Sequence, residues 1–237
     1  MTYRKNLLLA GLLLAGIAVQ ASAQDAPAAA TDSTAPTATW DLRRMQPVSG
    51  DAQAGAAKAA VCAACHGAQG VAIAPNFPNL AGQSATYLYV QLKEFHDGGR
   101  NDPVMTGQAA ALSDQDMRDL ASYYAGMAPK AAGQADASSR GSQLYLAGDP
   151  AKGIPPCQGC HGVDALGPKP HPSSAPQPSW ATWPRLRGQS SLYVAKQLAD
   201  FKSGARAGST NARVMQGVAR TLDDEDMQAL SGWLSNF

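Results

Sequence analysis

Two short segments of the chain hold all four of its cysteines. VCAACHG occupies residues 61–67 and PCQGCHG occupies residues 156–162, so both carry the pattern Cys-x-x-Cys-His-Gly. Thiols at this spacing can form a disulfide, bind a metal ion or bond covalently to a cofactor. The role that each chemistry gives to the histidine after each pair distinguishes the three possibilities. The residues concerned are Cys62, Cys65, His66, Cys157, Cys160 and His161.

Two of the three chemistries leave part of the pattern unexplained. A redox-active Cys-x-x-Cys pair belongs to a βαβ setting, and a disulfide gives the adjacent histidine no role. A structural zinc ion needs four ligands, usually from two separated pairs, whereas each segment offers two cysteines and one histidine. His96 has Lys202 at the equivalent position, and His171 lies in a stretch that the first segment's surroundings lack. Neither histidine completes a repeated zinc site.

Attachment of c-type haem uses every residue of the pattern. The two cysteines can form thioether bonds to the vinyl groups of one haem, and the following histidine becomes the proximal ligand of its iron. Gly67 and Gly162 then let the chain pass close to the macrocycle. The sequence therefore predicts two covalently bound haem c groups, with His66 and His161 as axial ligands.

From Gly50 onward the chain can be aligned with itself. PNLAGQ at residues 78–83 matches PRLRGQ at residues 184–189, and LSDQDM at 112–117 returns as LDDEDM at 222–227. Agreement over so many unlike residues indicates a tandem duplication. Further residues recur at one constant offset: Tyr87, Gln91, Leu92, Phe95, Gly98 and Arg100 match Tyr193, Gln197, Leu198, Phe201, Gly204 and Arg206.

Each repeat is predicted to form about three helices. The first, around residues 51–64, leads into the cysteine motif, and the second carries Leu88, Leu92 and Phe95 at helical spacing. The third begins in LSDQDM, where Ser113 is the N-cap of a capping box. No alternating strand pattern occurs, so the predicted fold class is all-α. A unit of this size buries little apolar surface by itself, and we expect the haem to supply the missing core.

The repeat also selects a sixth ligand for each iron. Met105 in DPVM and Met215 in ARVM recur, and we expect both in loops between the second and third helices, from which a thioether can reach the distal face of a haem. Met117 and Met227 recur as well, but each is placed to pack against the apolar residue that precedes the N-cap of its helix, a contact known as the hydrophobic staple. We therefore expect a packing role for these two methionines. Core packing is also the alternative for Met105 and Met215. His/Met ligation fills both axial positions, so the predicted work of the iron is the transfer of single electrons.

The segments outside the repeats predict a signal for export of the protein, a leader and a linker between the two domains. The first 23 residues have a basic tip, an apolar run from Leu7 to Val19 and the sequence Ala-Ser-Ala, which is typical of a cleaved signal peptide. An uncleaved membrane anchor is the alternative. Residues rich in Ala, Pro and Thr follow and predict a flexible leader. The predicted organisation is signal peptide 1–23, leader 24–49, first domain 50–128, linker 129–140 and second domain 141–237.

A Pro-rich insertion around residues 164–183 distinguishes the second repeat from the first, and its composition predicts a surface loop. Within it, His171 is either an exposed loop residue or an alternative iron ligand. Trp180 and Trp183 either pack the loop, shield the second haem edge or form a docking patch. The formal net charge of the 237-residue chain is +1, and Lys and Arg do not cluster, which excludes a nucleic-acid-binding surface.

Together these motifs resemble the class I cytochromes c, and their tandem arrangement resembles the dihaem cytochrome c4 family. The likeness covers residues 50–237. It implies two cytochrome c folds related by a pseudo-twofold axis. It also implies that the carbonyls of Pro78 and Pro184 accept hydrogen bonds from Nδ1–H of the ligating histidines. Arg100 and Arg206 either bind haem propionates or are solvated arginines at a helix end.

The resemblance further implies a periplasmic carrier, not an enzyme, that takes electrons from a quinol-oxidising cytochrome bc complex to a haem-copper terminal oxidase, with at most peripheral membrane association. One alternative is the cytochrome subunit of a periplasmic dehydrogenase, which receives electrons from a cofactor on another chain. A dihaem peroxidase is a second alternative. It requires an iron that opens a coordination site, and the paired Met105 and Met215 argue against it.

Overall fold

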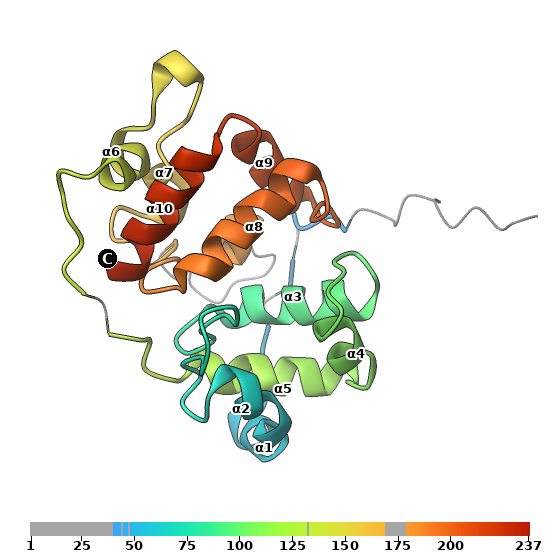
Figure 1. Cartoon of the computed structure of the whole chain (residues 1–237). Helices are drawn as coiled ribbons and strands as arrows, with labels where there is room; N and C mark the ends of the chain where they lie inside the picture. Colours follow the sequence, from blue (N-terminus) through green and yellow to red (C-terminus); the bar gives the residue numbers. More distant parts are fainter. Residues whose placement is uncertain (1–39, 44, 47, 132, 169–178) are drawn as a thin grey trace, which may run out of the picture. The chain divides into compact units, whose positions relative to one another are not determined.

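The computed structural model describes residues 40–43, 45–46, 48–131, 133–168 and 179–237. Regular structure in this part of the chain is helical apart from isolated bridging residue pairs, which confirms the all-α prediction (Figure 1). The first repeat forms α1 (Ala52–Lys58), α2 (Ala60–His66), α3 (Ala85–His96), α4 (Met105–Ala110) and α5 (Asp114–Ala125). The second repeat forms α6 (Arg140–Ala147), η1 (Pro150–Lys152), α7 (Gln158–His161), η2 (Ser179–Thr182), α8 (Ser191–Ser203), α9 (Thr210–Ala219) and α10 (Asp224–Asn236).

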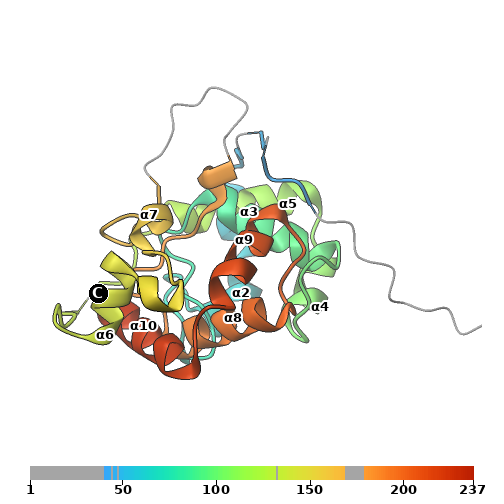
Figure 2. The same ribbon diagram turned by 90° about the horizontal axis from the view of Figure 1, so that it is seen from above.

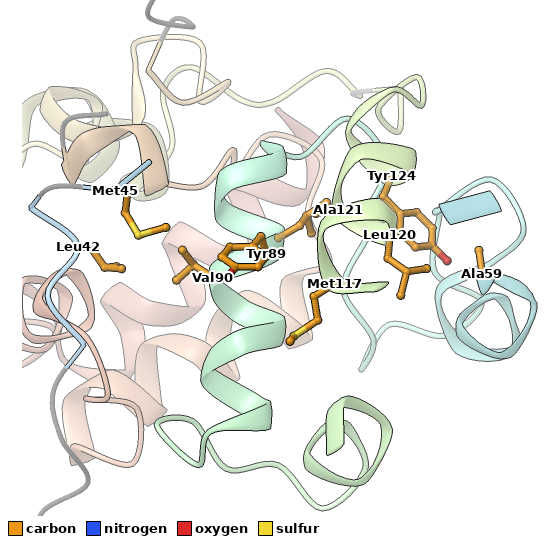
Figure 3. Packing of buried hydrophobic residues seen from close by; sticks show 10 residues of the cluster. Leu42, Met45, Ala59, Tyr89, Val90, Met117, Leu120, Ala121 and Tyr124 are labelled. Atoms are coloured by element: carbon orange, nitrogen blue, oxygen red, sulfur yellow. The ribbon is translucent and has the colours of Figure 1, made fainter. Parts of the chain in front are cut away.

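The last helix of each repeat is the centre of its packing. In the first repeat α5 packs against α1 and α3, and in the second repeat α10 packs against α6 and α8. Figure 3 shows Tyr89 and Val90 of α3 and Met117 and Leu120 of α5 in one apolar cluster. The capping box predicted at the start of α5 is present, with Ser113 as N-cap. Ser113 therefore fixes where α5 begins, and the buried residues Met117 and Leu120 of this helix pack against the rest of the repeat.

Two glycines allow the first helix of each repeat to cross the last one closely. A Cβ atom on Gly55 of α1 would lie 2.2 Å from the carbonyl oxygen of Asp119, and a Cβ atom on Gly141 of α6 would lie 2.2 Å from that of Ala229. The two crossings are therefore equivalent. After its crossing, the second repeat inserts η1 before the cysteine motif. In the first repeat the single helix predicted around residues 51–64 is divided at Ala59 into α1 and α2, and α2 contains the motif. In the second repeat η1 lies between the first helix and the motif, so the prediction of a helix leading directly into it is wrong there.

Part of the segment predicted to be a flexible leader is packed. Leu42 is 1% exposed, and Leu42 and Met45 both belong to the apolar cluster of the first repeat, where Figure 3 shows them beside α3. On its other side this segment contacts the second repeat, because Trp40 N–H donates to the Gly208 carbonyl at 2.7 Å and Thr210 N–H donates to the Trp40 carbonyl at 3.0 Å. Trp40, Leu42 and Met45 therefore link the two repeats, which the Ala-, Pro- and Thr-rich composition of this segment did not indicate.

The C-terminal end of the Pro-rich insertion is packed, whereas residues 169–178 of the predicted surface loop lie outside the described residues. It forms η2, drawn in orange in Figure 2, in which Thr182 is buried. Asn211 Nδ2 donates to Thr182 Oγ1, and Ser84 Oγ of the first repeat donates to the Ala181 carbonyl at 3.4 Å. Trp180 and Trp183 are half-buried. His171 and the signal peptide lie outside the described residues.

We predict that Gly141→Ala destabilises the protein by about 1–3 kcal/mol, the usual cost of forcing extra volume into a packed contact, because the added methyl group collides with the Ala229 carbonyl. Gly107→Ala is the matched control, since Gly107 is an exposed helix residue with open space at its Cβ position. Alanine there should leave stability unchanged or raise it. Thermal unfolding followed by circular dichroism measures both; equal midpoints would show that the crossing is not tight.

Candidate haem sites

The cysteine–histidine motifs end short helices in both repeats. Cys62 and Cys65 lie three residues apart in α2, so they share a helix face. Cys157 is the N-cap of α7 and Cys160 is its third residue. All four cysteines are free thiols in this structure. Each pair presents two thiols near one another, as attachment to one flat cofactor requires.

The glycine after each histidine is required by the backbone itself. Gly67 has φ 76° and Gly162 has φ 80°, in the left-handed region that favours glycine. A Cβ atom on Gly67 would lie 2.0 Å from the carbonyl oxygen of Val71, and one on Gly162 would lie 3.0 Å from that of Gly167. The pattern Cys-His-Gly therefore also encodes the tight exit of the chain from the helix.

Both histidines are buried and held in one orientation. His66 is 7% exposed and its Nδ1 lies 2.9 Å from the Pro78 carbonyl, while His161 is 6% exposed with Nδ1 3.0 Å from the Pro184 carbonyl. A carbonyl oxygen only accepts, so Nδ1 carries the proton in each ring. Burial lowers the pKa of both rings, although the bond to the carbonyl opposes this. The neutral rings keep the lone pair of Nε2 for a metal ion.

The environment of the cysteines differs from that of a redox-active pair. Burial raises the pKa of the Cys157 thiol to about 11 and that of Cys62 above its usual value, whereas reactive Cys-x-x-Cys pairs need a lowered pKa. The zinc alternative also lacks support, because the described residues contain no group of three or more His, Cys, Asp or Glu side chains that could hold a metal ion. The surroundings therefore favour the remaining chemistry, in which buried thiols bond to a haem.

An apolar lining accompanies each motif. Cys62 and the leucines Leu80 and Leu92 pack against the buried core of the first repeat while keeping partial exposure. Cys157, Leu186 and Leu198 do the same in the second repeat. These leucines occupy matching positions of the duplication. Half-exposed leucines next to two thiols and a histidine with an available nitrogen fit the apolar face of a macrocycle.

Met105 and Met215 come from helices and not from loops as predicted. Met105 is the first residue of α4, and Met215 lies within α9, where it packs against Phe201 and two alanines. The Asp102 side chain accepts hydrogen bonds from the backbone N–H of Val104 and Met105, both at 3.0 Å. An aspartate followed by proline is a typical helix start, so Asp-Pro in DPVM was a signal for α4. Both methionines remain half-buried, whereas Met117 and Met227 are buried, as predicted.

Arg100 and Arg206 are buried together between the repeats, so the alternative of solvated arginines is wrong. The Gln91 Oε1 atom accepts from Arg100 Nη1 at 2.6 Å and from Arg206 Nη2 at 2.6 Å. The Gln197 Oε1 atom accepts from Arg100 Nη2 at 2.6 Å and from Arg206 Nη1 at 2.9 Å. The two arginines and two glutamines therefore form a closed ring, which we name the Arg–Gln ring.

Two tyrosines complete this ring across the repeats, because Arg100 donates to Tyr193 OH and Arg206 donates to Tyr87 OH, both at 3.1 Å. The interface role of the glutamines and tyrosines was missed at the level of sequence, although their constant offset in the duplication was the available signal. Arg206 Nε is buried without a hydrogen-bond partner among the described residues. A donor of this kind fits an acceptor from a cofactor, such as a propionate.

Comparisons with known proteins agree with this geometry. A family model described as Cytochrome c matches residues 52–128 and 138–237. Cytochrome c4 of Pseudomonas aeruginosa is 41% identical over 198 residues, covering 83% of this chain and 93% of that protein. A protein of Thiomonas intermedia named thiosulfate dehydrogenase electron acceptor is 38% identical over 185 residues, covering 75% of this chain and 79% of that protein.

A solved structure gives the same result for the fold. The crystal structure of reduced recombinant cytochrome c4 from Pseudomonas stutzeri matches with a TM-score of 0.69 and 38% sequence identity, covering 80% of this chain and 100% of that chain. The tandem arrangement of two cytochrome c domains predicted from the duplication is thereby confirmed.

We predict that Gln197→Leu lowers the free energy of unfolding by about 3 kcal/mol, because both arginines lose an acceptor and hydrogen bonds to charged groups contribute about 1.5–3 kcal/mol each. Gln197→Glu is the matched control, since it keeps an oxygen between the guanidinium groups. Denaturant titration of the haem-loaded protein measures both variants. Unfolding of Gln197→Leu at the wild-type midpoint would contradict a structural role for the Arg–Gln ring.

Proposed function

The chain belongs to the cytochrome c4 family of dihaem electron-transfer cytochromes, and from this premise we propose which residues hold its two haem c groups and which partners exchange electrons with it. In the first repeat Cys62 and Cys65 form the thioethers, and His66 with Met105 ligates the iron. In the second repeat Cys157 and Cys160 form the thioethers, and His161 with Met215 ligates the iron.

One observation carries this assignment. In both repeats the proposed proximal histidine is neutral, buried and tied through Nδ1 to a proline carbonyl, which leaves Nε2 as the only ring nitrogen for a ligand. The bound haem supplies a one-electron couple whose potential His/Met ligation raises relative to bis-His ligation. The protein's residues fix the imidazole direction, exclude water with the leucine lining, and bring the two repeats together through the Arg–Gln ring.

Arg100 and Arg206 are proposed to direct propionate groups toward the interface between the repeats. A small cavity of about 50 Å³ there is lined by both arginines and by Asn101, Lys196 and Asp200, among others. The unpaired Nε of Arg206 adds a buried donor at the same place. Carboxylates are the natural acceptors for guanidinium groups in such a setting.

The proposed role is that of a periplasmic carrier between a quinol-oxidising cytochrome bc complex and a haem-copper terminal oxidase. Export rests on the signal sequence in residues 1–23. None of the helices in the described part of the chain has both the length and the apolar character needed to cross a bilayer.

A second candidate role follows from relatives. The Thiomonas intermedia relative is named as an electron acceptor of thiosulfate dehydrogenase, which favours the alternative of a cytochrome that receives electrons from a periplasmic dehydrogenase. Purification from the native membrane and soluble fractions separates the two roles. A free protein that is reduced by the cytochrome bc complex supports the carrier, and stable co-purification with a dehydrogenase supports the second candidate.

We predict that Met105→Ala and Met215→Ala each remove one of the two sulfur–iron absorption bands in the far red and allow carbon monoxide to bind one haem. Loss of the thioether opens one axial position, and the visible spectrum of the purified protein during a redox titration reports it. Met117→Leu is the matched control, because Met117 is buried in the core and the exchange conserves volume. Two intact sulfur–iron bands in either alanine variant would refute the ligand assignment.

A further inference from the structure

Each repeat inserts one glutamine amide against the backbone of the other repeat. Gln189 Oε1 accepts from Asn79 N–H at 2.8 Å, and Gln189 Nε2 donates to the Asn79 carbonyl at 3.0 Å. Reciprocally, Gln83 Oε1 accepts from Arg185 N–H at 3.0 Å, and Gln83 Nε2 donates to the Arg185 carbonyl at 2.9 Å. Gln83 is 6% exposed and Gln189 is 8% exposed, so these four bonds form away from solvent.

The orientation of both amides is determined by their partners. Gln83 Oε1 also accepts from Ser84 N–H at 2.9 Å, and Gln189 Oε1 accepts from Ser190 N–H at 2.9 Å. A backbone N–H can only donate, so the atom that faces two of them must be the carbonyl oxygen of the amide. Each glutamine therefore presents an acceptor to the opposite repeat.

The peptide groups that these glutamines contact are those that hold the histidines. Asn79 N–H and the Pro78 carbonyl belong to one peptide group, and this carbonyl accepts from His66 Nδ1 at 2.9 Å. Arg185 N–H and the Pro184 carbonyl likewise belong to one peptide group, which accepts from His161 Nδ1 at 3.0 Å. A single peptide group thus separates each histidine from a glutamine of the other repeat.

Hydrogen bonds in such a chain strengthen one another. When the N–H of a peptide group donates to the glutamine oxygen, the group is polarised and its carbonyl becomes a stronger acceptor. A stronger bond at Nδ1 raises the basicity of the imidazole and tunes the metal that it ligates. A more basic imidazole stabilises the oxidised iron over the reduced iron, so the midpoint potential falls.

We propose that Gln83 and Gln189 are positioning residues that act across the interface: Gln189 of the second repeat lowers the potential of the first haem through the Pro78–Asn79 peptide, and Gln83 of the first repeat lowers the potential of the second haem through the Pro184–Arg185 peptide. The inference rests on the proposed ligation by His66 and His161. It adds that each haem is tuned by a side chain that belongs to the other repeat.

The test uses Gln189→Met and Gln83→Met in the full, haem-loaded chain, because methionine approximates the volume of glutamine and has no carbonyl oxygen to accept the bond. Each variant is titrated in two backgrounds. Met215→Ala leaves the first haem as the one with His/Met ligation, and Met105→Ala leaves the second haem in that state. The remaining His/Met wave is thereby assigned to one repeat.

We expect crossed effects. Gln189→Met raises the midpoint of the first haem and leaves that of the second, and Gln83→Met does the reverse. The rise should stay within a tenfold change of the electron-uptake equilibrium, which is about 59 mV for a one-electron couple. In the reduced protein, the NMR signal of the Nδ1 proton should move for His66 in Gln189→Met and for His161 in Gln83→Met, because its hydrogen bond weakens.

Two further variants separate this effect from general loosening of the interface. Ser190→Ala removes the hydrogen bond that Ser190 Oγ donates to the Pro75 carbonyl of the first repeat, next to Gln189 but away from the Pro78–Asn79 peptide, and should leave the first haem's potential unchanged. Gln189→Glu keeps an oxygen acceptor for Asn79 N–H and should hold that potential at or below the wild-type value.

The inference is overturned if a methionine variant moves the haem of its own repeat alone, moves both haems equally, or moves neither. A shift in Ser190→Ala equal to that in Gln189→Met would also overturn it, since loosening alone would then suffice. If Met105→Ala and Met215→Ala fail to leave one His/Met wave each, the proposed ligation by Met105 and Met215 fails. The crossed shifts of the His66 and His161 Nδ1 proton signals then decide the inference, and their absence overturns it. If those backgrounds behave as expected and the crossed shifts are absent, this inference alone fails.

Discussion

The hydrogen bond from a histidine Nδ1 to a proline carbonyl is the constraint around which each repeat is organised. A neutral imidazole has one N–H, and once the proline accepts it, the direction of Nε2 is fixed by the position of that carbonyl. The helix must therefore end at the histidine, which the left-handed Gly67 and Gly162 accomplish. The Pro-x-Leu segment must return to the ring, and its leucine joins the apolar lining beside the cysteines.

Duplication makes the interface self-complementary. Equivalent residues of the two repeats make equivalent contacts across the interface. Each contact therefore occurs twice, with the roles of the repeats exchanged, as in an isologous dimer. Gln83 and Gln189 do this with the peptide groups that hold the histidines. Arg100 and Arg206 do it with the glutamines of the Arg–Gln ring. Gly208 permits a close backbone approach between the repeats, since a Cβ atom there would lie 2.0 Å from the Gly99 carbonyl oxygen.

Local chemistry could be predicted from the sequence, and contacts between distant segments could not. The cysteine–histidine spacing and the capping box at Ser113 depend on neighbours within a few residues, and the repeat is visible when the sequence is aligned with itself. The buried position of Leu42 depends on the apolar residues of α3 and on Thr210 at the start of α9, whose Oγ1 accepts from Leu42 N–H at 3.1 Å. Nothing in the sequence around Leu42 indicates either contact. The helix that begins near Asp102 had a local signal, Asp-Pro, which the expectation of a ligand loop overrode. The burial of Arg100 depends in part on Tyr193 and Gln197 of the other repeat, to which it donates hydrogen bonds.

The Arg–Gln ring brings two positive charges together in a buried position. Two guanidinium groups buried side by side repel each other, and amide oxygens satisfy their hydrogens without supplying negative charge. Gln91 Nε2 donates to Glu94 Oε2 at 3.1 Å, and Gln197 Nε2 donates to Asp200 Oδ2 at 3.3 Å. Glu94 and Asp200 occupy matching positions of the duplication. Each amide therefore lies between a carboxylate and both arginines. The two carboxylates balance the charge of the two guanidinium groups through polarised amides. Glutamine fits this position because its oxygen accepts from the arginines while its nitrogen donates to the carboxylate.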